Sequence, residues 1–168
     1  SMALPFVFQM CEAFNVPVIR MPGWEADDVI GTLARVGEEE GFTTYMVTPD
    51  KDFAQLVSDT TFISKPGRSG DGADILGVKE ILENWQIERV EQVIDILGLM
   101  GDASDNVPGV PGIGEKTAQK LIAEYGSLEN LLAQVEERKG KQRENLETYR
   151  EQAILSKELV TIERNVPL

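Results

Sequence analysis

The sequence predicts an α/β fold in which a mainly parallel sheet is followed by a helical lobe. Up to residue 77, short β-rich runs alternate with helical periodicity, a pattern typical of parallel strands joined by helices. From residue 78 onward the β signal nearly disappears and helical periodicity takes over. Apolar residues make up 42% of the 168 residues, which is enough to bury a core. We therefore expect two lobes, residues 1–77 and residues 78–168.

The first lobe is predicted to begin with a short helix and then to alternate. Val29, Ile30 and Leu33 lie on one stripe at helical spacing, and Gly41 supplies the C-terminal cap of that helix. Pro17 lies inside a β-rich run, and it favours an edge position or a strand start because proline has no N–H to donate. The expected helices are residues 5–14, 25–40 and 52–57, the expected strands are residues 16–19, 43–47 and 60–64, and a loop is expected over residues 65–71.

The second lobe is predicted to be entirely helical. Gly126 and Ser127 mark a clear break, because glycine ends one helix and serine caps the next. The expected helices are residues 78–85, 90–100, 115–125, 128–135 and 141–159.

Composition excludes several classes of protein. The single cysteine, Cys11, and the absence of histidine exclude a disulfide framework and a Cys/His zinc site, and they favour the cytoplasm. No apolar run approaches the roughly 18 residues of a membrane span. The net charge of −13 argues against binding nucleic acid through a basic face and, by itself, indicates solubility.

Acidic residues gather where strands are expected to meet helices. Ligands of parallel sheets bind at the carboxyl ends of the strands, so acids from successive junctions converge there. Taken singly, each acid also fits helix-dipole stabilisation or turn capping. Carboxylates clustered this closely repel one another, and divalent cations relieve the repulsion. An all-oxygen set suits Mg²⁺ or Mn²⁺, and two such ions would serve phosphodiester hydrolysis. The candidate ligands are Glu25, Asp27, Asp28, Asp50, Asp52, Asp102 and Asp105.

Asp102 and Asp105 are three residues apart, which is one turn if the backbone there is helical. They precede a turn rich in proline and glycine, from Pro108 to Gly114, which leads into a helix near Glu115. Its backbone N–H groups, the start of the helix and Lys116 would together form a cradle for a phosphate. An ordinary helix–turn–helix connection would explain the same prolines and glycines. A nucleotide-binding P-loop does not fit, because no strand precedes the turn.

Three ordered motifs resemble one known family. They are EADDVIGTL at residues 25–33, TPDKD at residues 48–52, and GDASDNVPG followed by GIGEKTA at residues 101–118. They are similar to the 5′→3′ exonuclease domain of bacterial DNA polymerase I, in the flap-endonuclease superfamily. The resemblance runs from about residue 5 to residue 168. It implies a PIN-like α/β fold and a metal-dependent nuclease that removes 5′ flaps or RNA primers in DNA replication and repair.

The resemblance also implies roles for particular residues. The seven candidate acids map onto the ligands of the family's two metal ions, with Asp28 and Asp50 as catalytic residues. The glycine turn maps onto a helix–three-turn–helix that grips the backbone of duplex DNA, often with K⁺ held by turn carbonyls. The implied backbone contacts are Gly109, Gly112, Gly114, Lys116 and Thr117.

The sequence departs from the family at its start. Family members begin with a strand that carries an aspartate, and they continue through a further ligand aspartate and a basic helical arch. This sequence matches only the segment after the arch, so we expect a fragment of a larger polymerase with an incomplete site and little activity alone. Its DNA partners would be flapped or nicked duplexes and RNA primer–DNA. The alternative is a non-catalytic duplex-binding module. An exposed sheet edge would also favour dimers.

Overall fold

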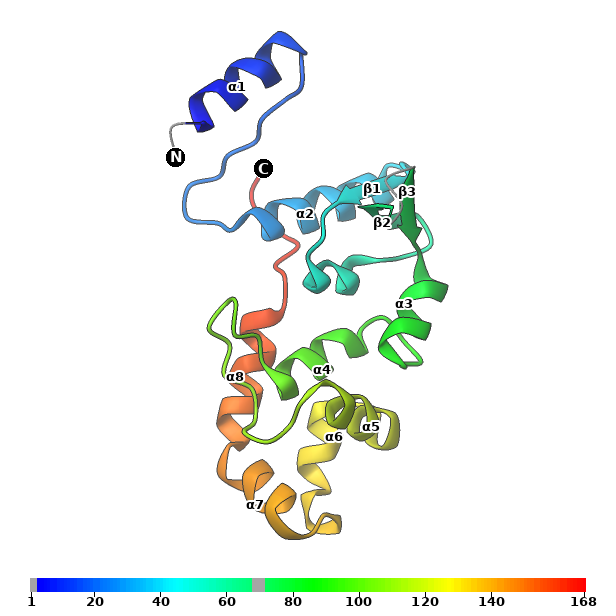
Figure 1. Cartoon of the computed structure of the whole chain (residues 1–168), viewed down its shortest axis with the longest axis vertical. Helices are drawn as coiled ribbons and strands as arrows, with labels where there is room; N and C mark the ends of the chain where they lie inside the picture. Colours follow the sequence, from blue (N-terminus) through cyan, green and yellow to red (C-terminus); the bar gives the residue numbers. More distant parts are fainter. Residues whose placement is uncertain (1–2, 68–71) are drawn as a thin grey trace.

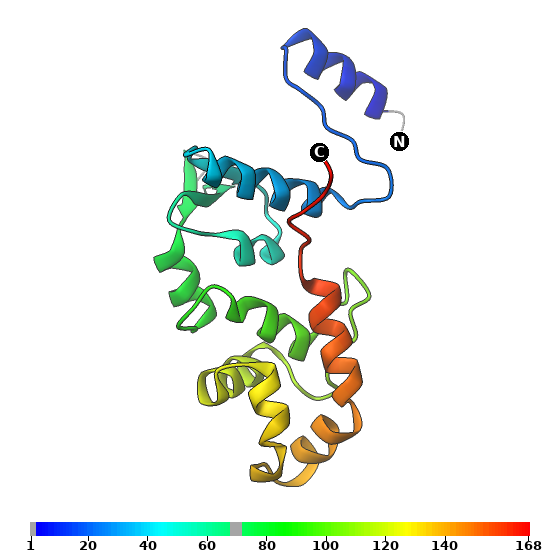
Figure 2. The ribbon, with the colours of Figure 1, turned by 180° about the vertical axis from the view of Figure 1, so that it is seen from behind.

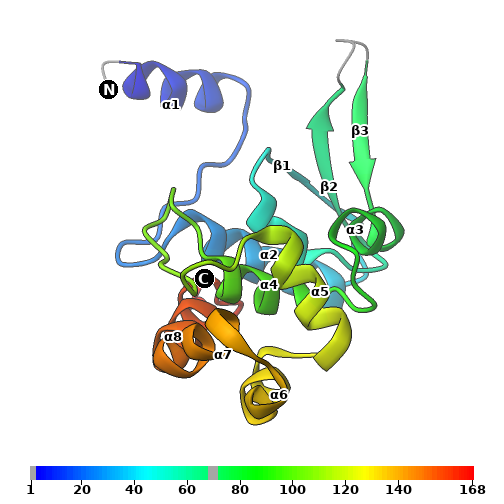
Figure 3. The same ribbon diagram turned by 60° about the horizontal axis from the view of Figure 1, so that its bottom comes forward.

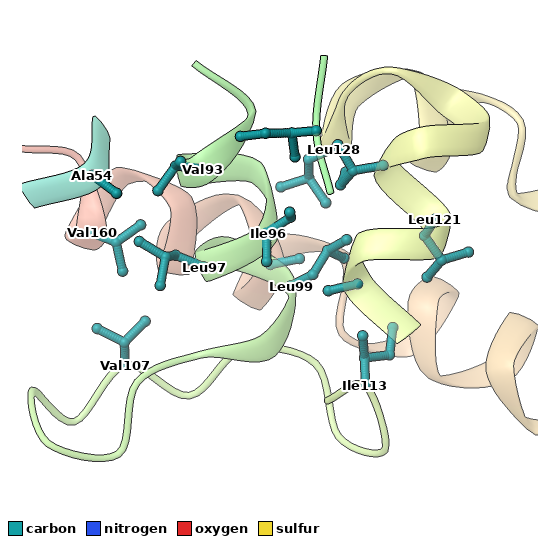
Figure 4. Packing of buried hydrophobic residues seen from close by; sticks show 14 of the residues in the cluster. Ala54, Val93, Ile96, Leu97, Leu99, Val107, Ile113, Leu121, Leu128 and Val160 are labelled. Carbon is teal, nitrogen blue, oxygen red and sulfur yellow. The ribbon is translucent and has the colours of Figure 1, made fainter. Parts of the chain in front are cut away.

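Helix α4 (Gln92–Met100) lies at the centre of the core in the computed structural model, which describes residues 3–67 and 72–168. Its Val93, Ile96, Leu97 and Leu99 are fully buried. Figure 4 shows these side chains between the short helix η1 on one side and helices α5, α6 and α8 on the others. A helix that is apolar all round is stable only when other elements cover it, and the rest of the fold supplies that cover.

Figure 1 shows the order of the elements along the chain, which follows the prediction except at residues 16–19, 73–76 and 141–159. The helices are α1 (Leu4–Ala13), α2 (Ala26–Glu39), α3 (Val78–Trp85), α4 (Gln92–Met100), α5 (Glu115–Tyr125), α6 (Leu128–Ala133), α7 (Gly140–Thr148) and α8 (Arg150–Val160), with short 3₁₀ helices η1 (Lys51–Leu56) and η2 (Val135–Glu137). The strands are β1 (Thr44–Val47), β2 (Thr61–Pro66) and β3 (Ala73–Leu76).

Within the described residues the sheet has three strands in the order β1-β2-β3. Strands β1 and β2 are parallel, as predicted, and η1 connects them. Strand β3 was not predicted, and it pairs with β2 in the antiparallel direction. Figure 3 shows β2 and β3 side by side, leading into α3. The α/β class is confirmed, and part of the predicted loop over residues 65–71 lies outside the described residues.

Two predictions about regular structure are wrong. Residues 16–19 form no strand in the described chain, because β-branched residues make a strand only where a neighbouring strand accepts their hydrogen bonds. The helix predicted over residues 141–159 is divided at Tyr149, where α7 ends and α8 begins. Two smaller differences are that residues 51–56 form a 3₁₀ helix and that α6 ends at Ala133.

Helices α4 and α8 cross closely. A Cβ added at Gly98 would lie 2.8 Å from Cβ of Lys157, so glycine permits the approach. Lys157 then reaches across, and its Nζ lies 2.7 Å from Oδ1 of the buried Asp95 on α4. Nζ of Lys157 also lies 2.8 Å from Oε1 of Glu129 on α6. Helices α4, α6 and α8 are therefore joined by one buried ion pair and one partly exposed ion pair.

After α8 the chain returns to the first lobe and runs beside α2 (Figures 1 and 2). The N–H of Val166 donates to Oγ1 of Thr32 at 3.0 Å, and the N–H of Glu163 donates to Oδ1 of Asp28 at 2.9 Å. Arg35 Nε donates to the carbonyl oxygen of Arg164 at 2.8 Å. Residues 162–166 therefore bind the two lobes together.

Helix α1 projects away from the rest of the molecule on an extended segment (Figures 1 and 2). None of its residues, all of which lie in the described part of the chain, is buried. Its Phe6 and Met10 and the following Phe14 are exposed. No helix among the described residues has the length and apolar character that crossing a membrane requires.

Candidate metal centre

The end of β1 positions the first two acids. Asp50 caps the start of η1, where its Oδ1 accepts a hydrogen bond from the N–H of Asp52 at 3.0 Å. This turn points Asp52 inward, and its side chain is buried. A carboxylate that follows a strand in an aspartate-capped turn is thereby fixed at the carboxyl end of the sheet.

The next two acids lie in a tight turn after α4, so the condition of a helical backbone under which their spacing was considered is not met. The backbones of Asp102 and Val107 exchange hydrogen bonds of 2.9 and 2.8 Å, which closes a loop over residues 102–107. Oxygen atoms of Asp52, Asp102 and Asp105 nevertheless lie within 4.8 Å of one another. The predicted convergence of these three acids is therefore observed, although a turn rather than a helix produces it.

Glycine makes this turn possible. Gly101 has a φ of 72°, and Gly109 has a φ of 59°, so both adopt backbone conformations that favour glycine. A Cβ added at Gly109 would lie 2.4 Å from the backbone N of Gly101. Both positions therefore require glycine, and the contact between them fixes the loop that carries Asp102 and Asp105.

The remaining acids come from the start of α2. Glu25 caps this helix, and its N–H lies 3.4 Å from Oδ2 of Asp28. A cleft of about 310 Å³ brings Glu25, Asp27 and Asp28 together with Asp50, Asp52 and Asp105. Asp102 lines an adjoining hollow with Asp50, Lys51 and Asp105. The structure thus gathers six of the predicted acids on one cleft and places the seventh beside it.

Asp52 is the most strongly perturbed of these acids. Burial, together with the charges of Asp50 and Asp102, raises the pKa of Asp52 to about 6. Its Oδ1 is buried and has no hydrogen-bond partner among the described residues. A buried carboxylate oxygen without a partner is costly, and a bound cation would remove that cost. The donor set and this oxygen together fit a divalent ion held by oxygen ligands.

Lys51 is the cation nearest to this cluster in the described chain. Its Nζ lies 2.7 Å from Oδ2 of Asp102, which is buried. The hydrogen bond from Lys51 lowers the pKa of Asp102. Burial acts to lower the pKa of Lys51, but Asp102 outweighs it and the pKa is raised. Sequence reasoning missed this contact, although the position of Lys51 between Asp50 and Asp52 was a signal for it.

The glycine turn joins α4 to α5 and divides into a buried part and an exposed part. Gly109 is buried, its N–H donates to Oγ of Ser156 at 3.0 Å, and its carbonyl accepts from Nε2 of Gln152 at 2.7 Å. Its N–H is therefore not free for a phosphate, contrary to the prediction. Gly112 and Gly114 are exposed, and their N–H groups have no hydrogen-bond acceptor among the described residues.

The start of α5 completes this exposed part. Lys116 is exposed and Thr117 is half-buried in the first turn of the helix. Nδ2 of Asn145, on α7, donates to the carbonyl of Pro111 at 2.8 Å and holds the turn in place. Free N–H groups, a helix N-terminus and a lysine thus lie together, as predicted for a phosphate cradle.

The fold and the site define a class of protein: an α/β protein with a carboxylate-lined cleft and an attached helical lobe. The family model described as 5′–3′ exonuclease, N-terminal resolvase-like domain, matches residues 1–91. The family model described as 5′–3′ exonuclease, C-terminal SAM fold, matches residues 88–168. The chain belongs to the 5′–3′ exonuclease family.

Bacterial DNA polymerases I are similar to the chain over nearly its whole length. The identity is 40% over 169 residues with the enzyme of Geobacillus stearothermophilus, covering 100% of the chain and 19% of that protein. The enzyme of Lactococcus lactis subsp. cremoris is 41% identical over 174 residues, covering 98% and 19%. The chain thus spans about a fifth of the length of the curated relatives it matches.

Solved structures of bacteriophage T5 nucleases share the fold. A T5 5′-exonuclease with bound divalent zinc ions superposes with a TM-score of 0.82 at 25% identity, covering 95% of the chain and 58% of that protein. A T5 flap endonuclease in a complex with DNA and metal ions gives 0.80 at 25% identity, covering 93% and 56%. The catalytic core of Rad2 gives 0.61 at 19% identity, covering 98% and 57%, and shares the fold alone.

Proposed function

We propose that the chain is the 5′→3′ exonuclease and 5′-flap endonuclease part of a DNA polymerase I, which hydrolyses phosphodiester bonds during replication and repair. The observation that carries this proposal is the buried, unpartnered Oδ1 of Asp52 inside a cluster of carboxylates. The likeness to T5 nucleases solved with metal ions and DNA supports it.

The ions would be Mg²⁺ or Mn²⁺, two in the intact domain. When bound, they supply an acidified water and a charge that stabilises the leaving oxygen. Asp52, Asp102 and Asp105 would hold an ion from one side, and Glu25 and Asp27 would face it across the cleft. Asp28 and Asp50, whose carboxylates are fixed by backbone N–H donors, would be the catalytic pair.

The substrate would be DNA with a 5′ flap or a nick, or an RNA primer on DNA. Gly112, Gly114, Lys116 and Thr117 would hold a backbone phosphate, and turn carbonyls would hold K⁺. Gly109 would contribute by shaping the turn, since its N–H is engaged. In this helix–three-turn–helix arrangement the turn belongs to a separate helical lobe, and Gly77, which caps α3, is the proposed boundary between lobes.

Cleavage of 5′-flap DNA by the full-length protein tests this function. Asp50→Ala should abolish cleavage in Mg²⁺ while the chain stays folded, because Asp50 is exposed and its removal costs only the cap of η1. Asp59→Ala, an exposed aspartate outside the cleft, is the matched control and should cleave normally. Cleavage by Asp50→Ala at the normal rate would refute the assignment.

The isolated chain tests the two remaining expectations. We expect it to cleave little by itself, since the chain spans about a fifth of the length of the curated relatives it matches. Salt-dependent binding of duplex DNA without cleavage, even by the full-length protein, would favour a non-catalytic binding module instead.

Strand β1 is an edge strand of the described sheet with Tyr45 and Val47 exposed, which supports dimerisation of the chain. Light scattering that detects monomer alone at high concentration would contradict this.

A further inference from the structure

Another cavity shares Lys51 with the hollow that contains Asp102, and it has a different character. It measures about 270 Å³ and lies between η1, β2, α3 and the start of α5. Its polar wall consists of Lys51, Lys65, Asn84 and Glu115, and Trp85 supplies an aromatic side chain. The rest of the wall is apolar. We call it the Lys65 pocket.

The Lys65 pocket bridges the two regions that the proposed function assigns to DNA. Lys51 lines both this pocket and the hollow that contains Asp102. At the other end, Glu115 is the first residue of α5 and follows directly on Gly114. A DNA strand that reached from the acid cluster to the glycine turn would therefore pass over the Lys65 pocket.

Partial burial distinguishes Lys65 from the other basic residues that form no ion pair among the described residues, such as Lys116 and Lys120, which are exposed. Lys65 is half-buried, and its ammonium has no ion pair or hydrogen bond within residues 3–67 and 72–168. Asp74 lies opposite Lys65 on β3 and Glu115 lines the same pocket, but neither forms an ion pair with the Lys65 ammonium within the described residues. A half-buried ammonium without an ion pair attracts an anion.

We propose that the Lys65 pocket binds a backbone phosphate of the DNA strand, between the acid cluster and the glycine turn. Lys65 would contribute the charge, Asn84 a neutral hydrogen-bond donor, and Trp85 a flat face for the adjacent sugar or base. Glu115 faces the same pocket and disfavours a free multivalent anion relative to a singly charged phosphodiester. This site rests on the proposed function, because it requires DNA at both neighbouring regions.

Equilibrium binding of 5′-flap DNA in EDTA tests the charge of Lys65 without cleavage. Lys65→Met should weaken binding about threefold to tenfold and reduce the slope of log K against log salt by about one. Lys65→Arg should restore both. Lys139→Met is the matched control, because Lys139 is exposed directly before α7. Figure 1 shows α7 at the other end of the molecule from β2, so the substitution should change affinity less than about twofold.

Trp85 reports on the pocket itself. The chain has two tryptophans, so Trp24→Phe leaves Trp85 as the single fluorophore. Saturating flap DNA should change its emission, and Lys65→Met should shift the titration midpoint as it shifts the affinity. If the parent chain binds DNA but neither Lys65→Met nor Trp85 emission responds, the pocket proposal is overturned and the proposed function stands. If the full-length parent protein binds no flap DNA at any salt concentration, the pocket proposal and the proposed function are both refuted.

Discussion

Asp52→Asn should stabilise the metal-free protein while removing its capacity to bind metal. The pKa of Asp52 is about 6 in the fold, against an ordinary value of 3.8, because of burial and the charges of Asp50 and Asp102. The folded state therefore holds a proton on Asp52 more tightly than the unfolded state does. Stability rises as the pH falls from above 6 toward 3.8, and above pH 6 the ionised carboxylate costs stability.

The magnitude follows from the gap between the two pKa values. About two pH units at ~1.4 kcal/mol each give a cost of about 3 kcal/mol at pH 8. Asparagine carries no charge, so Asp52→Asn should recover most of that cost. In a chain of this size the gain corresponds to a rise of roughly 6–12 °C in melting temperature. At pH 5 the advantage should shrink to less than about 2 kcal/mol, because Asp52 is then mostly protonated in the fold.

Urea and thermal unfolding in EDTA measure the stability difference between Asp52→Asn and the parent chain at pH 8 and at pH 5. Asp59→Asn, which changes an exposed carboxylate outside the cleft, should shift stability by less than about 0.5 kcal/mol. Added Mn²⁺ should raise the melting temperature of the parent chain and have little effect on Asp52→Asn. If Asp52→Asn is no more stable than the parent at pH 8, or if its advantage is independent of pH, the electrostatic account of the cleft is wrong.

Three further substitutions test other contacts. Lys51→Met should lower the melting temperature in EDTA and tighten Mn²⁺ binding about tenfold in a thermal-shift titration, since a competing positive charge leaves the cleft; unchanged metal affinity would count against this. Gly109→Ala should lower the free energy of unfolding in urea by about 2–4 kcal/mol, because its Cβ would lie 2.4 Å from the backbone N of Gly101. Gly114→Ala, whose Cβ meets no described atom within 4 Å, should lower it by less than about 1 kcal/mol. Lys157→Met should cost about 3 kcal/mol because it leaves Asp95 buried without its cation; a cost below about 1 kcal/mol would contradict that.

Helices with strong local signals were predictable from the sequence. Helices α3 and α5 begin and end at the predicted residues. Their residues have helical periodicity, Gly77 precedes α3, and Gly114 and Gly126 flank α5. The wrong strand over residues 16–19 and the missed strand β3 have the opposite cause. Pairing with a distant segment decides whether a short run becomes a strand, and local composition does not record that partner.

The candidate site was predictable in composition but not in geometry. The acids of three segments were expected to converge, and the structure brings them to one cleft and its adjoining hollow. That they bind metal remains a prediction. The Lys51–Asp102 contact and the engagement of Gly109 by Ser156 depend on tertiary packing between segments far apart in sequence. The spacing of Asp102 and Asp105 thus indicated correctly that the two carboxylates lie close together. A turn, and not a helix, brings them there.

The hydrogen bonds from residues 162–166 to α2 have a consequence for biosynthesis. During translation, the segment that carries Asp28 emerges from the ribosome more than a hundred residues before Glu163, its backbone donor, and before Val160 and Ile162, which line the same cleft. A nascent chain ending at α7 lacks that wall. The cleft is therefore complete only after residues 160–163 have been synthesised, although α2 and η1 contact each other directly.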